Sequence, residues 1–218
     1  MTEKKVAVVL SGCGVYDGAE IHESVLTLLA LNQQGAVYQC FAPDIDQHHV
    51  IDHLNGQEMD EHRNVLVESA RIARGDIKPL SEFDAGEFDA IMLPGGFGAA
   101  KNLSSFAFEG PDCRVNEDVS SAVKAMAEKR KPIGALCITP AVIARVLDGA
   151  QVTIGQDKDT AAAIEAMGGH HEQTRHGQVT VDEKLNLVTS PCYMLEASII
   201  EIAEDASNMV TEVLRRAG

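Results

Sequence analysis

Cys137 is the residue of this sequence whose position best suits nucleophilic chemistry. It lies in Lys131-Pro-Ile-Gly-Ala-Leu-Cys-Ile-Thr-Pro-Ala141, where a short apolar strand runs directly into a predicted helix with Pro140 in its first turn. Such a junction exposes the side chain at a sharp turn, as in the nucleophile elbow, although the glycines of G-x-S-x-G are absent. The positive end of the helix dipole predicts a lowered thiol pKa. The alternative is a buried cysteine that acts as a small apolar residue.

A glycine-rich segment, Pro94-Gly-Gly-Phe-Gly98, follows another apolar strand. Glycines let the backbone approach a reacting group and direct N–H groups at it. The amides of Gly96 and Ile138 could therefore form an oxyanion site, and we include the neighbouring Gly95 as a substrate-binding residue. The alternative is an ordinary tight turn. The segment lacks the G-K-[ST] of a phosphate loop, which argues against nucleotide binding there.

Glu23 is the candidate acid–base group, since it lies within a helix that is apolar on most sides. A buried carboxyl tends to keep its proton, so it could donate a hydrogen bond to a thiolate and then transfer that proton. The alternative is a Glu23 that faces solvent. Asp17 and Glu20 have the spacing of a capping box at the start of this helix. His22, Cys13 and Glu20 are possible accessory residues.

Two further clusters contain His, Asp and Glu side chains of the kinds that bind metals or assist catalysis. The segment 44–55 holds His48, His49 and His53 with Asp44 and Asp46, but a polar loop of this kind is typically solvated. His170-His171-Glu172 contains H-x-E, a possible partner set for Cys137, although a surface turn after Gly168-Gly169 is the alternative. We expect neither a metal site nor a cofactor.

The elements that must position these residues alternate between strand and helix. Apolar strands are predicted at 6–10, 36–42, 88–93, 132–136 and 152–154, with a hairpin at 179–188, and helices at 20–34, 64–72, 115–129, 138–147, 160–167 and 194–216. This order predicts an α/β fold with a mostly parallel sheet covered by helices on both faces. Ligands bind beyond the carboxyl ends of such strands, where the segments around Gly14, Gly96 and Cys137 fall. No repeat or linker divides the chain, so 1–218 is expected to be one domain.

Composition restricts the class of partner and compartment. Acidic residues outnumber basic ones by 33 to 18, a net charge of −15 that argues against nucleic acid and anionic membrane partners. The chain has five cysteines without a C-x-x-C pair, so we expect reduced thiols. The start of the sequence lacks the pattern of a signal peptide, which predicts a cytoplasmic protein. The apolar helix 20–34 needs more cover than one sheet provides, which predicts a homodimer.

Together these residues resemble the PfpI superfamily, which includes the parkinsonism-linked deglycase and has the class I glutamine amidotransferase-like fold. The resemblance covers about Val6 to Val213 and is greatest to the ElbB-type branch, named for enhancing lycopene biosynthesis. It rests on Ser11-Gly-Cys-Gly-Val-Tyr-Asp-Gly-Ala-Glu-Ile-His-Glu23, on Pro94-Gly-Gly-Phe-Gly-Ala-Ala-Lys-Asn-Leu103 and on Cys137-Ile-Thr-Pro140. It implies a flavodoxin-like three-layer sandwich.

The resemblance also implies a site and a reaction. Cys137 would be the nucleophile, Glu23 its protonated partner, and the Gly96 and Ile138 amides the oxyanion site of a homodimeric enzyme. The enzyme would convert glyoxal or a similar small 2-oxoaldehyde to glycolate or the matching hydroxy acid, without glutathione or another cofactor. The reaction would pass through a hemithioacetal on Cys137. Protein deglycation is a related activity that the resemblance also implies. Many relatives have His directly after the Cys or soon after the next strand. This sequence has Ile138 and no His at 152–155, which argues against a protease-like or amidotransferase-like hydrolase.

Two alternative functions remain: a dinucleotide-binding enzyme and a non-catalytic protein. Gly12-Cys13-Gly14 follows a strand, and Asp44 ends the next one, which nearly fits a dinucleotide-binding fingerprint, but Asp17 occupies the third glycine position. A non-catalytic redox sensor or chaperone-like protein would use the same Cys137 thiolate, oxidised to a sulfinate beside Glu23.

Overall fold

A seven-stranded sheet forms the centre of the computed structural model, which describes residues 3–218. The strand pairs are parallel except for β10–β11, which is antiparallel and matches the predicted hairpin. The structure therefore confirms the mostly parallel α/β sheet. The strands lie in the order β10 (Thr180–Asp182), β11 (Leu187–Ser190), β7 (Ile133–Leu136), β6 (Ala90–Leu93), β1 (Lys5–Val9), β2 (Val37–Ala42) and β5 (Ile77–Pro79).

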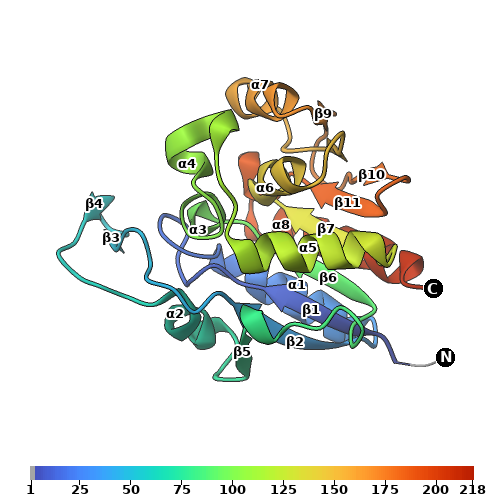
Figure 1. Cartoon of the computed structure of the whole chain (residues 1–218), viewed down its shortest axis with the longest axis horizontal. Helices are drawn as coiled ribbons and strands as arrows, with labels where there is room; N and C mark the ends of the chain where they lie inside the picture. Colours follow the sequence, from blue (N-terminus) through green and yellow to red (C-terminus); the bar gives the residue numbers. More distant parts are fainter. Residues whose placement is uncertain (1–2) are drawn as a thin grey trace.

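Helices cover both faces of this sheet (Figure 1). Side chains alternate across a strand, so Val6 and Val8 of β1 join one buried cluster while Ala7 and Val9 join another. The first cluster packs against α1 (Ile21–Gln33) and α8 (Ile199–Arg216), and the second against α5 (Glu117–Glu128) and α6 (Thr139–Val146). The sheet and the helical layers on its two faces make the three-layer sandwich.

Smaller elements lie mainly at the ends of the sheet. Figure 1 shows α3, α4, α6 and α7 gathered on one side of the molecule, above the ends of the central strands. The bounds are α2 (Val65–Ile72), α3 (Phe97–Lys101), α4 (Phe106–Glu109) and α7 (Lys158–Ala166), with 3-10 turns η1 (Leu80–Glu82), η2 (Gly110–Asp112) and η3 (Cys192–Met194). Two short strand pairs are β3 (Ile51–Asp52) with β4 (Gln57–Glu58), and β8 (Gln151–Val152) with β9 (His170–His171).

Some predicted boundaries are wrong for identifiable reasons. The last helix begins at Ile199 instead of 194, because Ser198 and Glu201 form a capping box there. The preceding residues 192–194 form η3 instead. His170 and His171 form strand β9 instead of a surface turn, and segment 44–55 contains β3. Strand β5 and helices α3 and α4 have no counterpart among the predicted elements.

The predicted capping box between Asp17 and Glu20 is also wrong. Glu20 itself is the N-cap of α1, and its side chain accepts a hydrogen bond from the Glu23 N–H at 2.7 Å. The buried Asp17 carboxylate instead accepts the N–H of Ile51 at 2.7 Å. Asp17 therefore joins the loop after β1 to the segment that precedes α2.

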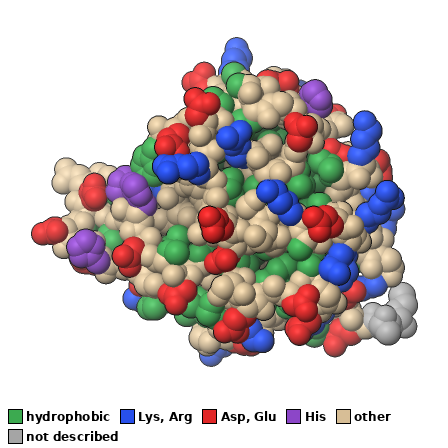
Figure 2. Space-filling view, in the orientation of Figure 1, with side chains coloured by type: hydrophobic (Ala, Val, Ile, Leu, Met, Phe, Trp, Pro, Cys, Tyr) green, Lys and Arg blue, Asp and Glu red, His purple; other side chains and the backbone are tan. Residues whose placement is uncertain are grey.

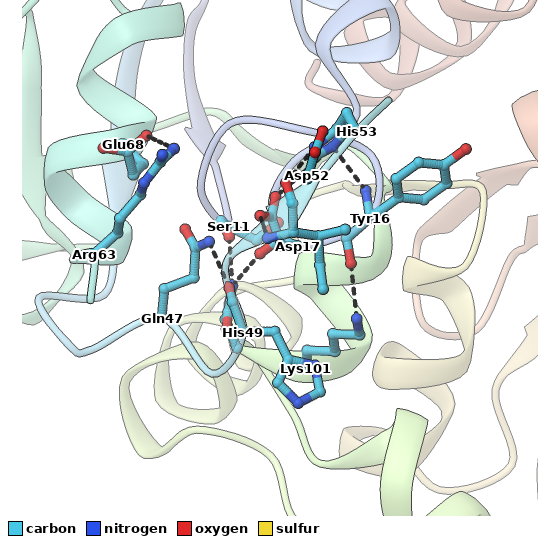
Figure 3. Close-up of polar contacts among 12 residues, drawn as sticks. Ser11, Tyr16, Asp17, Gln47, His49, Asp52, His53, Arg63, Glu68 and Lys101 are labelled. Atoms are coloured by element: carbon cyan, nitrogen blue, oxygen red, sulfur yellow. Dashed lines mark hydrogen bonds and ion pairs between the residues drawn. The ribbon is translucent and has the colours of Figure 1, made fainter. Parts of the chain in front are cut away.

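Further contacts hold this loop in place (Figure 3). The N–H of Tyr16 donates to Nε2 of His53 at 3.2 Å, and the two rings stack with centroids 4.9 Å apart. On the other side, Lys101 Nζ donates to the Tyr16 carbonyl at 2.8 Å. The loop between β1 and α1 is thus held from two neighbouring segments.

The surface mixes charges of both signs. Figure 2 shows acidic and basic side chains interspersed with hydrophobic ones, and histidines near the end where β3 and β4 lie. Within residues 3–218, no helix has the length and apolar character needed to cross a bilayer.

Candidate active site

Loops from four parallel strands meet at the carboxyl end of the sheet. The loop after β1 contacts the loop after β6 through backbone hydrogen bonds from Glu20 N to Gly95 O (2.8 Å) and from Phe97 N to Val15 O (2.8 Å). The turn after β7 contacts the end of β11 through a bond from Cys137 N to Ser190 O (3.0 Å). These contacts bring residues far apart in the sequence around one point.

Cys137 lies in the sharp strand-to-helix turn that its sequence predicts. Strand β7 ends at Leu136 and α6 begins at Thr139, with Cys137 between them at a φ of 61°. A positive φ is unfavourable for a residue with a side chain, and such strain is typically found at functional sites. The hydroxyl of Thr139 donates to the Pro94 carbonyl at 2.9 Å, which holds the turn against the loop after β6.

Glu23 is completely buried beside this thiol. Its Oε2 accepts the N–H of Gly95 at 2.9 Å, and its Oε1 accepts the N–H of Tyr193 at 3.2 Å. The carboxyl also forms a hydrogen bond with the Cys137 thiol. Two backbone amides and one thiol therefore fix the orientation of the Glu23 side chain.

The two glycines after β6 allow this close arrangement. A Cβ on Gly95 would overlap the Cys137 side chain and lie 2.6 Å from Glu23 Oε2. Gly96 has a φ of 100°, which residues with a side chain rarely adopt, and its N–H donates to the Cys137 sulfur together with the N–H of Ile138. The predicted pair of amides thus meets at Sγ. Gly95 holds Glu23 and is not among the described residues that line the cavity.

Burial dominates the electrostatics of this pair. It raises the pKa of Glu23 from 4.5 to about 8, with a further contribution from the charge of Glu20. Burial, followed by the charge of Glu23, also raises the pKa of the Cys137 thiol well above its usual value and outweighs the two amide donors. The expectation of a lowered thiol pKa is therefore wrong, because Cys137 is only 7% exposed and lies beside the Glu23 carboxyl.

The two raised values mean that the pair ionises as a unit. An ionised Glu23 opposes formation of the thiolate, whereas a protonated Glu23 exerts no such repulsion and can donate to the sulfur. A singly deprotonated pair, with one proton held between sulfur and carboxyl, is the form that suits nucleophilic attack.

This coupling leads to a prediction for thiol reactivity. In the Glu23→Gln variant, we expect the pH midpoint for iodoacetamide labelling of Cys137 to fall below that of the wild type. The substitution removes the negative charge that raises the thiol pKa. Labelling rates measured by peptide mass spectrometry as a function of pH test this, with Glu20→Gln as the control expected to shift the midpoint less. An unchanged or higher midpoint in Glu23→Gln would contradict the coupling.

The Cys137 sulfur faces a cavity of about 520 Å³. Its lining is mostly apolar and comes from the β1–α1 loop, α3, α4, the start of η2, the turn between β7 and α6, α7 and η3. Asp157 and Asp159 lie at the start of α7, and no Lys or Arg is present among the described residues that line the cavity. Its lining includes Val15, Gly96, Phe97, Ala100, Phe106, Ala107, Cys137, Ile138, Asp157, Asp159, Thr160, Ala163, Tyr193 and Met194.

The remaining sequence candidates lie outside this cavity. Glu20 is a helix cap, and burial, followed by the charge of Glu68, raises the pKa of the Cys13 thiol. His22 is on α1 next to Glu23, and its Nδ1 lies 2.8 Å from the Tyr193 hydroxyl. The H-x-E residues His170 and Glu172 belong to the β8–β9 region and do not line the cavity. Across residues 3–218, no group of three or more His, Cys, Asp or Glu side chains has a metal-binding arrangement.

Tyr193 lines the cavity but no sequence pattern indicated it. It lies three residues after the end of β11, so the rule that ligands bind beyond the carboxyl ends of strands covers this position as well. The predicted strand ended at residue 188 and the predicted helix began at 194, so the Ser190-Pro191-Cys192-Tyr193 turn fell between predicted elements.

Comparison with known proteins agrees with this fold. The DJ-1/PfpI family model matches residues 15–196, so the chain belongs to the DJ-1/PfpI family. A human relative, glutamine amidotransferase-like class 1 domain-containing protein 3, mitochondrial, is 47% identical, over 98% of this chain and 84% of its own length. The Danio rerio ES1 protein, mitochondrial, is 37% identical, over 96% of this chain and 85% of its own length.

A solved structure is also very similar. The isoprenoid biosynthesis protein with amidotransferase-like domain from Ehrlichia chaffeensis superposes with a TM-score of 0.90 and 34% identity. The match covers 97% of this chain and 99% of that protein.

The expectation of a cytoplasmic protein is overturned by these relatives. The names of the human and Danio rerio proteins place both in mitochondria. The absence of a signal-peptide pattern, on which that expectation rested, says nothing about mitochondria.

Proposed function

We propose that this protein is a glyoxalase-type enzyme that converts glyoxal, or a similar small 2-oxoaldehyde, to the corresponding hydroxy acid without glutathione. The observation that carries the proposal is the buried Cys137–Glu23 pair, which faces a cavity and has two backbone amides on the sulfur. The pair combines a nucleophile with an acid–base group, which are the two groups that the reaction needs.

The proposed reaction begins with attack of the Cys137 thiolate on one aldehyde carbon. A C–S bond forms, and the carbonyl oxygen takes up a proton to give a hemithioacetal. The Glu23 carboxylate removes the proton on that carbon and returns it to the second carbon, which gives a thioester with a terminal hydroxymethyl group. Water then cleaves the C–S bond, releasing glycolate and the thiol. The sum is one glyoxal and one water converted to glycolic acid, with no external oxidant or reductant.

The cavity lining supports a small uncharged substrate. Apolar side chains surround the sulfur, and the charges at its mouth are those of Asp157 and Asp159. Carboxylates at a cavity mouth repel anions and leave a neutral aldehyde unaffected. A neutral 2-oxoaldehyde therefore fits the site better than a keto acid or a phosphorylated sugar.

Membership of the ElbB-type branch and a deglycase activity are also part of the proposal. Membership of the ElbB-type branch is supported by the 11–23 segment and by the likeness to the Ehrlichia protein, whose title includes isoprenoid biosynthesis. Deglycation of proteins would use the same thiol on an aldehyde already bound to an amine. The dinucleotide-binding alternative finds little support, because α1 begins at Ile21, seven residues after Gly14, so the strand–turn–helix fingerprint is not formed.

Product identification tests the proposed reaction. Purified protein incubated with glyoxal, in a buffer free of glutathione, is expected to form glycolate in equal amount to the glyoxal consumed, as measured by proton NMR. Protein alkylated with iodoacetamide serves as the control and should form none. Glyoxal consumption without glycolate would contradict the proposal. Formation of a Cys137 sulfinate under mild peroxide, in a protein without turnover, would favour the redox-sensor alternative.

We also propose that the protein is a homodimer through α1. Ile21, Val25 and Leu29 lie at i, i+4 and i+8 on this helix and are 42%, 47% and 47% exposed, respectively. Side chains at this spacing form one apolar stripe on the helix surface, which a second copy could cover.

Sedimentation measures this association. The wild type is expected to have a mass near twice 23.4 kDa, and the Leu29→Glu variant a mass near 23.4 kDa, because a charge in the stripe is costly to bury. Val67→Asp on α2 makes a comparable change at an exposed site and should leave the mass unchanged. A wild-type monomer, or a Leu29→Glu dimer, would contradict the proposed interface.

A further inference from the structure

Tyr193 brings a second polar group to the cavity that holds Cys137. It is in η3, directly after β11, and lines the cavity together with Cys137 and Met194. Its backbone N–H is one of the two amides that hold Glu23. Tyr193 as a whole is half-buried, while the hydrogen bond between its hydroxyl and His22 is exposed.

The hydroxyl of Tyr193 has a specific partner in His22. The phenol oxygen lies 2.8 Å from His22 Nδ1, and the two ring centroids are 5.9 Å apart. His22 is exposed on α1, one residue before Glu23. Residues 22 and 23 of α1 therefore serve two adjacent groups: Glu23 contacts the Cys137 thiol, and His22 contacts the phenol.

The proposed reaction has a step that Glu23 alone does not complete. When the proton on the first carbon leaves, the electrons move to the oxygen of the second carbon, which must gain a proton. When a proton then reaches the second carbon, the oxygen of the first carbon must lose one. The amides of Gly96 and Ile138 can donate hydrogen bonds to an oxyanion but cannot give up or accept a proton.

We propose that Tyr193 is the catalytic acid–base group for these two oxygens and that His22 is its positioning residue, an inference that rests on the proposed function. Tyr193 donates its proton to the oxygen of the second carbon as the enediol forms. The resulting phenolate accepts a hydrogen bond from His22 and then takes the proton from the oxygen of the first carbon as the thioester forms. One proton leaves the phenol and one returns, so Tyr193 ends the cycle unchanged.

The surroundings of the phenol suit this role. Burial, followed by the charges of Glu20 and Glu23, raises the pKa of Tyr193 above its usual value. The resting phenol therefore carries its proton at neutral pH and can donate it. A hydrogen bond from the imidazole stabilises the transient phenolate, which is otherwise costly next to carboxylates.

The Tyr193→Phe variant tests the inference directly. It keeps the backbone N–H on Glu23 and removes only the hydroxyl. We expect kcat for glyoxal conversion to fall by about 10²-fold, the lower end for loss of a general acid–base group, while KM and the rate of Cys137 alkylation stay near wild type. Tyr38→Phe, on β2 and away from the cavity, is the matched control and should keep wild-type kcat.

The His22→Gln variant tests the pairing with Tyr193. Its loss of kcat should be smaller, and the double variant should be no slower than Tyr193→Phe alone, because His22 acts only through the phenol. A Tyr193→Phe variant with wild-type kcat overturns the inference while the proposed function stands. Additive losses overturn the role of His22, and a wild type that forms no glycolate overturns both the proposed function and the inference.

Discussion

Replacing Cys137 by serine is expected to reduce glycolate formation to the rate of buffer alone. The serine hydroxyl is far less acidic than a thiol, and burial beside Glu23 makes its anion still less accessible. The change replaces the sulfur atom by a smaller oxygen atom and adds no bulk, so the fold should persist. Glyoxal turnover measured by NMR, together with a thermal unfolding curve, separates loss of chemistry from loss of structure.

The matched control is Cys192→Ala. Cys192 is also buried, lies in the neighbouring turn and has a positive φ of 41°, but it does not line the cavity. This variant should retain most of the activity. Equal loss in the Cys137 and Cys192 variants would mean that the thiols act through packing, and the assignment of Cys137 as nucleophile would fail.

Replacing Glu23 by glutamine is expected to lower glyoxal turnover by about 10²- to 10⁴-fold, the range for removal of a general acid–base group. Glutamine keeps the shape of the side chain and can still accept the N–H of Gly95. It can neither remove nor deliver a proton. Glu20→Gln is the comparison, since its amide oxygen can still cap the Glu23 N–H, and it should lose much less activity.

The same substitution should increase stability at alkaline pH. The pKa of Glu23 is raised from 4.5 to about 8, so the folded wild type binds a proton that the unfolded chain releases within this window. Wild-type stability therefore falls as the pH rises through the window, whereas the Gln variant has no proton there to lose.

The melting temperature of Glu23→Gln, relative to wild type, should therefore rise between about pH 5 and about pH 8, by the equivalent of a few kcal/mol. A difference that is constant across this range would mean that Glu23 is not protonated in the folded protein. Equal activity of the Glu20→Gln and Glu23→Gln variants would contradict the catalytic assignment.

The sequence predicted the parts of the site that depend on local pattern. The turn at Cys137 and the glycines after β6 follow from short apolar strands that end abruptly, and the α/β alternation places them at one edge. Glu23 was recognisable because a carboxylate in an apolar helix lacks an obvious solvent face. The likeness to a known family was consistent with these assignments.

Other features depended on tertiary contacts that spacing does not encode. Asp17 and Glu20 have capping-box spacing. The Asp17 carboxylate accepts the N–H of Ile51 instead, and Glu20 is the residue that caps α1. The thiol pKa depended on burial, which outweighs the dipole of a short helix. Tyr193 was missed because its contacts are with His22 and Glu23, 171 and 170 residues away in sequence.

The close fit of Gly95 against Cys137 and Glu23 separates a part of the protein that cannot vary from a cavity lining that can. Even one methyl group added to Gly95 would overlap the Cys137 side chain and the Glu23 carboxyl, so only glycine allows these two groups to lie together. The cavity lining, by contrast, includes side chains of α4 and α7, such as Phe106, Ala107 and Ala163. Substitutions in these two helices can therefore reshape the cavity without disturbing the Cys137–Glu23 pair.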